Sequence, residues 1–286
     1  MNKLTLTIIF FNSIFNLKAQ DFQHDFFERD YIMNHGIDII RIENTCTSNA
    51  FITDGQSYCD LKTNTQEYFF NKFGLVDSFK IKNLHDVLTF KESNVFDQNQ
   101  RLVQKTTYLG VNSDDISSIS YTYNEQNKKI QEVNIRRIQD EIVLLDTIKY
   151  EWRGDTCLKF SIIDGEPMGT VLFMVYNQDN LETMKGEYDW CDQTLKYTIS
   201  KNIYKNKQLV EEILYDITEG KTTHNYFYND WDNKGRIKFK TKLLDSGADA
   251  VSTNYVFNGD ILVEMVEKEK ITGDVFKSTY FYILNN

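Results

Sequence analysis

Four histidines are the first residues to test for metal or acid–base chemistry. His24, His35, His85 and His224 lie far apart in the chain, and none stands in a spacing such as His-x-x-x-His or His-x-Glu. A zinc site needs ligands that one helix or hairpin can bring together. The chain also lacks the Gly-x-Ser-x-Gly, P-loop and Gly-x-Gly-x-x-Gly motifs. The sequence therefore predicts no catalytic residue, metal ligand or cofactor, and it favours a protein without enzymatic activity.

One acidic stretch imitates the start of a calcium-binding loop. Asp230 and Asp232 alternate along it, and Gly235 holds the sixth place. In such a loop, alternating oxygen ligands wrap the ion and a glycine allows the sharp turn. Here Lys234 occupies the fifth, ligand-bearing place, and Thr241 stands where a bidentate glutamate belongs. We interpret the stretch as a hairpin turn.

Four cysteines in an exported chain suggest disulfides, although four cysteines allow three connectivities. The pair Cys46 and Cys59 is plausible because the segment between them is polar and loop-like. The pair Cys157 and Cys191 conflicts with a hairpin topology, which places these residues at opposite edges of a sheet. A strand of about eight residues separates those edges by roughly 26 Å, beyond the reach of a disulfide. We expect Cys157 and Cys191 to stay unpaired.

From about residue 65 the chain repeats an aromatic residue followed by a polar turn and then an aliphatic residue. We call these aromatic residues the predicted anchors. They recur every 24 to 29 residues, which is the length of one hairpin. Asn, Asp and Gly in the turns supply the positive φ angles that tight hairpin connections need. The predicted anchors are Phe70, Phe96, Tyr123, Trp152, Tyr176, Tyr204, Tyr228, Phe257 and Tyr282.

The flanking residues alternate as strands require. Val251, Thr253, Tyr255 and Phe257 share one parity, so one face of the strand is apolar and the other is wet. Repeated units of this kind need neighbours to bury their apolar faces. We therefore predict an all-β fold: an antiparallel meander of repeated hairpins in an open or curled single sheet, with one short N-terminal helix.

The N-terminal segment differs from the repeats. Residues 1–20 match a secretory signal peptide, with Lys3 before an apolar run and Ala19 before the cleavage point. Residues 21–64 contain a helix candidate ending at Gly36, a strand over Ile37–Glu43 and the cysteine loop. Residues 65–286 form the β-hairpin repeat domain. We expect a secreted, periplasmic or cell-surface protein.

The turns resemble the YD repeats of the bacterial Rhs family, whose units read roughly Tyr-x-Tyr-Asp, a short gap, Gly, a basic residue and Leu. The segment Tyr226–Ile237, which ends in Gly-Arg-Ile, and Phe96-Asp97 through Arg101-Leu102 match best. The resemblance spans residues 68–282 and is degenerate. It implies a secreted or surface β-sheet shell or scaffold. In the family, toxin activity belongs to appended domains, so the resemblance implies no activity for this chain.

Charge and hydropathy limit the partners. The formal net charge of −10, with basic residues scattered among acidic ones, argues against nucleic acid. After the first segment no apolar run reaches the length of about 20 residues that a transmembrane helix needs. An unknown protein or glycan is the expected partner.

Three functions remain open. The first is an exported, non-catalytic β-repeat scaffold or binding protein that contacts its partner through an exposed face or its turn tips. The second is an outer-membrane β-barrel, which also consists of hairpins with alternating polarity. Adjacent charges such as Arg136-Arg137 and Glu211-Glu212 oppose it, because one charge of each pair must face lipid. The third is a secreted glycan-active hydrolase whose aromatic residues stack on sugars.

Overall fold

The computed structural model describes residues 29–47, 63–109, 114–163, 166–189, 195–216, 219–244, 249–269 and 273–284. These residues form one helix, α2 (Arg29–Asn34), and 18 strands. The strands are β1 (Ile37–Thr47), β2 (Asn64–Phe70), β3 (Val76–Asn83), β4 (Leu88–Phe96), β5 (Leu102–Leu109), β6 (Asp115–Tyr123), β7 (Lys129–Ile138), β8 (Glu141–Arg153), β9 (Thr156–Ile163), β10 (Glu166–Tyr176), β11 (Glu182–Asp189), β12 (Leu195–Lys205), β13 (Gln208–Asp216), β14 (Lys221–Trp231), β15 (Ile237–Leu243), β16 (Asp249–Asn258), β17 (Ile261–Glu269) and β18 (Val275–Leu284).

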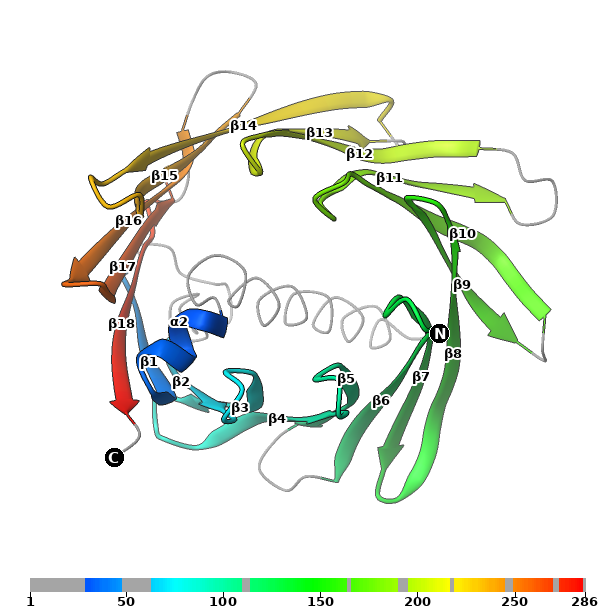
Figure 1. Ribbon diagram of the computed structural model, residues 1–286, viewed down its shortest axis with the longest axis horizontal. Coiled ribbons are helices and arrows are strands. Elements are labelled where there is room, and N and C mark those ends of the chain that lie inside the picture. The colour runs from blue at the N-terminus through cyan, green and yellow to red at the C-terminus, as the bar shows by residue number, and fades with distance from the viewer. Residues whose placement is uncertain are drawn as a thin grey trace.

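The sheet is a closed antiparallel barrel. Each strand pairs with the next one in the chain, and β1 pairs with both β2 and β18. The seam between β1 and β18 runs from Ile37 opposite Leu284 to Thr47 opposite Val275. Figure 1 shows the strands as a ring that surrounds α2.

The prediction of an all-β chain of antiparallel hairpins is confirmed, but the prediction of an open or curled sheet is wrong. The sequence predicts the strand Ile37–Glu43 outside the repeats, yet as part of β1 it pairs with both β2 and β18 and so joins the two ends of the repeat array. Closure removes both free edges of the sheet. It also favours the second interpretation, a barrel, over an open scaffold.

One turn geometry recurs among the hairpins. In six of them an Asn or Asp side-chain oxygen accepts hydrogen bonds from the backbone N–H groups two and four residues later. The residue three positions later has a positive φ angle, as in Gly74 and Gly235. This explains why Asn, Asp and Gly punctuate the repeat. The first residues of these turns are Asn71, Asn83, Asp97, Asn124, Asn177 and Asp232.

A bulge accompanies most turns at one end of the barrel. In seven hairpins the register shifts by one residue where the aromatic residue before the turn pairs with the following strand, as at Phe96 opposite Leu102. Bulges bend a strand and increase its local twist. Because they recur at one end of successive hairpins, they promote the curvature that closes the sheet.

The helix α2 packs at the end of the barrel that carries these turns, which we call the α2 end. Gly36, with a φ of 58°, follows the helix as the sequence predicts. Arg29 Nε donates to the carbonyl of Phe73 at 2.7 Å, and the Tyr31 hydroxyl donates to the carbonyl of Asp260 at 3.1 Å. The helix thus bridges turns on opposite flanks of the β1–β18 seam.

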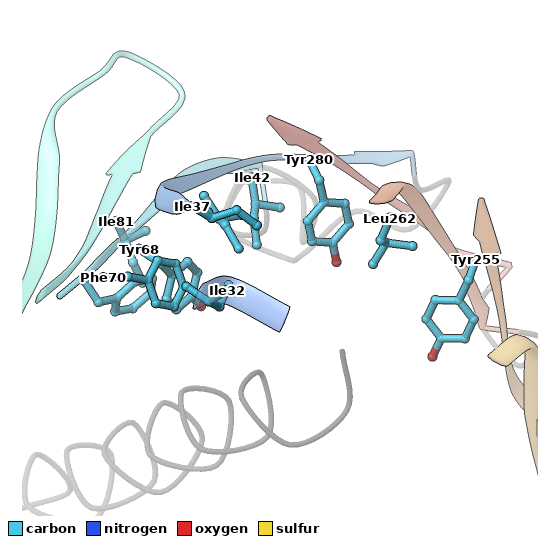
Figure 2. Packing of buried hydrophobic residues seen from close by; sticks show 11 residues of the cluster. Ile32, Ile37, Ile42, Tyr68, Phe70, Ile81, Tyr255, Leu262 and Tyr280 are labelled. Atoms are coloured by element: carbon cyan, nitrogen blue, oxygen red, sulfur yellow. The ribbon is translucent and has the colours of Figure 1, made fainter. Parts of the chain in front are cut away.

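The main core lies between α2 and the strands around the seam. Ile32 of α2 is 1% exposed and belongs to a cluster with Ile40, Tyr68 and Tyr280. Figure 2 shows Ile32 beside Tyr68 and Phe70, with Tyr280 and Leu262 contributed by the far side of the seam. We call the sheet face that carries these residues the inner wall.

The opposite face, the outer wall, differs from one side of the barrel to the other. Arg41, Glu67, Lys80 and Lys91 are successive cross-strand partners on β1 to β4, so they form a charged belt on the outer wall. On β9 and β10 the outer wall instead carries a small apolar cluster. Its buried members are Leu158, Phe160, Val171 and Phe173.

Candidate functional site on the inner wall

The aromatic residues that precede the turns form a ring on the inner wall at the α2 end. Eight of the nine predicted anchors occupy this position. Tyr228 does not: it is 58% exposed on the outer wall, and Trp231 stands directly before the turn at Asp232. We call the resulting set the anchor ring. It consists of Phe70, Phe96, Tyr123, Trp152, Tyr176, Tyr204, Trp231, Phe257 and Tyr282.

Polar atoms of the anchor ring bind the preceding strand. The Tyr123 hydroxyl donates to the carbonyl of Leu102 at 2.8 Å, and the Trp152 indole donates to the carbonyl of Lys129 at 2.8 Å. Tyr204 and Tyr282 donate in the same way to Glu182 and Leu262, at 3.0 and 2.6 Å. Each bond fastens the end of one strand to the start of the strand before it. These anchors therefore stabilise the barrel rim.

Basic residues at the ends of the turns connect neighbouring units. Arg101 lies 5.0 Å from the centre of the Tyr123 ring, Lys128 4.4 Å from Trp152, and Arg236 4.2 Å from Phe257. In each case the cation stacks on the anchor of the following hairpin. Arg101 and Arg236, which stand at the basic position of the YD-like pattern, both stack on the anchor of the following hairpin.

The calcium-like stretch is a turn closed by an ion pair. The Asp232 carboxylate accepts hydrogen bonds from Arg236 Nε and Nη2 at 2.8 and 2.6 Å, and from the backbone of Lys234. Hydrogen bonds from Arg236 lower the pKa of Asp232 to about 2. Lys234 Nζ binds Asp260 at 2.7 Å. Within the described residues no group of three or more His, Cys, Asp or Glu side chains could hold a metal ion.

A second ring of inward side chains lies two residues before the anchors. Five of its nine members are tyrosines, and Tyr68, Tyr255 and Tyr280 are at most 8% exposed. Burial raises the pKa of Tyr68, Tyr121, Tyr150 and Tyr280. These hydroxyls are therefore neutral hydrogen-bonding groups over the ordinary pH range. The ring consists of Tyr68, Asn94, Tyr121, Tyr150, Met174, Asn202, Asn229, Tyr255 and Tyr280.

Glu132 is the centre of an ionic cluster on this wall. It is 8% exposed, and its Oε2 accepts from Lys129 Nζ at 2.8 Å and from the Tyr150 hydroxyl at 2.5 Å. Burial alone would raise the pKa of Glu132, but Lys129 and the hydrogen bonds from Lys129 and Tyr150 together hold it below its ordinary value. Lys129 also lies over the rings of Tyr121 and Tyr150. The carboxylate is thus kept charged inside the barrel.

Two further basic groups extend the cluster around the wall. Lys105 Nζ binds buried Glu92 at 2.8 Å. Lys159 lies 5.7 Å from the centre of the Tyr150 ring and makes no ion pair within the described part of the chain. We call Glu92, Lys105, Glu132, Lys129 and Lys159, together with Tyr121 and Tyr150, the inner-wall site. It combines aromatic faces with Lys159, whose charge helps to lower the pKa of Glu132 but which forms no ion pair with it.

The cysteines and histidines lie outside this chemistry. Cys46 is disulfide-bonded, while Cys59 and Cys191 lie outside the described residues, so the Cys46–Cys59 pairing stays a prediction. Cys157 is a free, buried thiol whose pKa burial raises to about 11. His224 binds Glu211 on the outer wall at 2.8 Å, and His85 is exposed. His24 lies outside the described residues.

The sequence alone does not reveal the inner-wall site, because strand alternation assigns charged residues to the wet face of a strand. A usable signal was present two residues before Tyr123 and Trp152, where Tyr121 and Tyr150 share the parity of the anchors. Glu132 pairs with Tyr121 across β6 and β7, but that contact depends on register.

No helix among the described residues is long and apolar enough to cross a membrane.

Comparisons with known proteins find similarity in structure alone. No family model and no curated protein matches the chain. A porin-like protein from Bacteroides uniformis aligns over 87% of this chain and 97% of its own, at 9% identity and a TM-score of 0.32. A porin-like protein from Bacteroides vulgatus aligns over 84% and 97%, at 11% identity and a TM-score of 0.24. The Photorhabdus luminescens Tc holotoxin pore aligns over 78% of this chain and 14% of its own, at 10% identity and a TM-score of 0.27. These scores assign no function.

Proposed function

We propose that the protein is a β-barrel of the cell envelope that holds a small ligand against its inner wall. The observation that carries the proposal is the inner-wall site, where buried charges and tyrosines gather on the concave face of a closed sheet. A barrel of 18 strands encloses more space than one layer of inward side chains fills. The partner would then contact the interior rather than the turn tips, whose polar groups bind one another.

The chemistry of the wall suggests an amphipathic anion as ligand. Tyr121 and Tyr150 offer aromatic faces and neutral hydroxyls, while Lys159 offers a positive charge without an ion-pair partner in the described chain. An aromatic or apolar body with an acidic group complements both features. The paired carboxylates of Glu92 and Glu132 would orient such a ligand without repelling it strongly.

A dye titration tests this proposal. 1-Anilinonaphthalene-8-sulfonate carries an aromatic body and an anionic group, so we expect it to bind the folded protein with enhanced fluorescence. Lys159→Met should weaken binding at least fivefold. Lys149→Met is the matched control, because Lys149 is exposed on the adjacent strand and faces outward. Equal affinities of the two variants would contradict an inner-wall site.

A second candidate is insertion of the barrel in the outer membrane, which closure of the sheet favours. Exposed apolar side chains on the outer wall, such as Phe281 and Ile283 at 44% and 51% exposure, suit a lipid environment. The charged belt on β1 to β4 suits water, since a basic side chain facing lipid at mid-membrane costs about 2 to 4 kcal/mol. Expression without detergent decides between a barrel in water and a barrel in the outer membrane. Recovery of a folded, detergent-free monomer favours the first, and recovery only from membranes favours the second.

A further inference from the structure

The β7–β8 hairpin extends beyond the barrel wall at the end opposite α2. Strand β8 has 13 residues, whereas β9 has 8. Pairing between β8 and β9 begins at Thr147 opposite Ile162. The segment Glu141–Asp146 is paired with β7 on one side and has no β9 partner among the described residues. It is therefore an exposed sheet edge at the rim of the barrel.

This edge is apolar on both faces. Ile142, Val143, Leu144 and Leu145 are 58%, 52%, 51% and 65% exposed. A shift in register beside Arg137 makes Val143 the extra residue of a bulge. Four consecutive exposed aliphatic side chains on a free edge are the features of a strand-pairing surface.

The charges around the edge are mainly acidic. Glu141 and Asp146 bracket the apolar run, and Asp114 and Asp140 lie at the same tip, where the carbonyl of Asp114 accepts from Gln139. Arg136 is held by Asp115 through two hydrogen bonds of 2.8 and 2.6 Å. A partner with positive charge on either side of an apolar run would complement this arrangement.

We propose that the edge Glu141–Asp146 binds an extended peptide segment of a partner protein, with an apolar middle and basic residues at both ends. The segment pairs antiparallel with β8 and adds one strand to the β7–β8 hairpin, so that backbone hydrogen bonds supply affinity. Its basic ends meet Glu141 and Asp146, which fixes the register.

Two other occupants are disfavoured, one by charge and one by the unpaired backbone. In an antiparallel pair of two copies of this edge, Glu141 lies opposite Asp146 of the other copy, and like charges directly opposite one another are destabilising. A bilayer leaves the edge N–H and C=O groups of β8 without partners in hydrocarbon. A basic extended peptide satisfies both the backbone and the charges.

Fluorescent peptides test the proposal with the full-length protein at low salt. The probes are Lys-Val-Thr-Val-Thr-Val-Lys and its acidic counterpart Glu-Val-Thr-Val-Thr-Val-Glu, followed by fluorescence anisotropy. We expect the basic peptide to bind at least tenfold more tightly than the acidic one. The double variant Glu141→Lys/Asp146→Lys should invert this preference, because it exchanges the charges and leaves the apolar run in place.

A second pair of variants separates edge binding from general surface stickiness. Val143→Ser/Leu145→Ser should weaken binding of the basic peptide at least fivefold. Val95→Ser should leave it unchanged, since Val95 is 50% exposed but lies on β4, where it pairs with β5. All three substitutions are at exposed positions, so both variants should fold.

Four results would overturn the proposal. They are equal affinity for the two peptides, retention of binding by Val143→Ser/Leu145→Ser, a dimer in light scattering that this variant dissociates, and cosedimentation with phosphatidylcholine vesicles that this variant abolishes. The third result would identify a second copy as the occupant, and the fourth a bilayer.

Discussion

At the scale of single residues, the Tyr and Trp side chains before the turns stabilise the barrel rim through hydrogen bonds to the preceding strand. The carbonyl that a Tyr or Trp anchor reaches lies beside the bulge at the start of the preceding strand, as Leu262 does for Tyr282. Eight of the nine predicted anchors lie directly before a turn or at the equivalent place in the last strand. In the remaining hairpin Tyr228 and Trp231 both precede a polar turn, and the turn bonds of Asp232 identify Trp231 as the residue at this position.

Removal of one anchor hydroxyl should measure this role. Tyr282→Phe leaves the ring in place and takes away the 2.6 Å hydrogen bond to Leu262. We expect the free energy of unfolding to fall by about 1 kcal/mol, the usual value of such a bond. Tyr228→Phe, at a 58% exposed position, should change it negligibly. Urea denaturation followed by tyrosine fluorescence compares the two, and equal losses would contradict a fastening role.

Glu132 should make stability depend on acid pH. Its pKa lies below the ordinary value of 4.5 in the folded protein, so the unfolded chain binds a proton first as the pH falls. The stabilisation is therefore present above about pH 4.5 and is lost as the pH falls through the folded-state pKa.

The variant Glu132→Gln should flatten the decline in melting temperature between pH 5 and pH 3, a window set by the lowered pKa of Glu132. Glu151→Gln, a change of the same charge at a 43% exposed side chain, serves as the control and should keep the wild-type decline. An unchanged profile in Glu132→Gln would show that the cluster does not hold the carboxylate charged.

At the scale of elements, α2 is fixed by close approach to a turn. A methyl group at Gly74, between β2 and β3, would lie 2.8 Å from the carbonyl oxygen of Arg29 in α2. The nearest atom is backbone, so the helix itself must move to admit a side chain. The short helix and its glycine stop were predictable from sequence, but this contact joins segments 45 residues apart and required the fold.

Alanine at Gly74 tests the attachment of α2. Gly74→Ala introduces both backbone strain, at a φ of 69°, and the clash with α2. Gly259→Ala has nearly the same φ, 61°, and no atom within 4 Å of the added methyl, so it isolates the strain of roughly 1 to 2 kcal/mol. We expect Gly74→Ala to lose at least about 1 kcal/mol more, in the range of overpacked sites. Thermal unfolding measures the difference, and equal losses would contradict a close α2 contact.

At the scale of the whole molecule, the seam between β1 and β18 decides the architecture. It joins Ile37 to Leu284, the pairing with the largest separation in sequence among the described strands. Without it, the same hairpins would form an open sheet with two free edges. Closure also decides which face of the sheet becomes the interior. The face that carries the tyrosines and the paired charges is the one that lies inside.

A pair of isoleucines across the seam tests its contribution. Ile40, on β1, is fully buried, whereas Ile283, on β18, is 51% exposed and faces outward. Ile40→Ala should cost about 2 to 5 kcal/mol, as large-to-small changes in a core do. Ile283→Ala should cost less than about 0.5 kcal/mol. Far-UV and near-UV circular dichroism should report one shared transition for Ile40→Ala, and separate transitions would contradict a seam that unites the barrel.

The sequence by itself determined the hairpins: their period, their turns, the alternation of their faces and the aromatic residue that ends every second strand. These features depend on residues within one unit, because turn chemistry and side-chain alternation act over a few positions. Only the tertiary structure decided that the sheet closes. Closure depends on the twist and bulges summed over 18 strands and on the place of β1, which no single repeat encodes. It brought Glu132, Tyr150 and Lys159 together on an inner wall and left β8 with the one edge we propose as a docking site among the described strands.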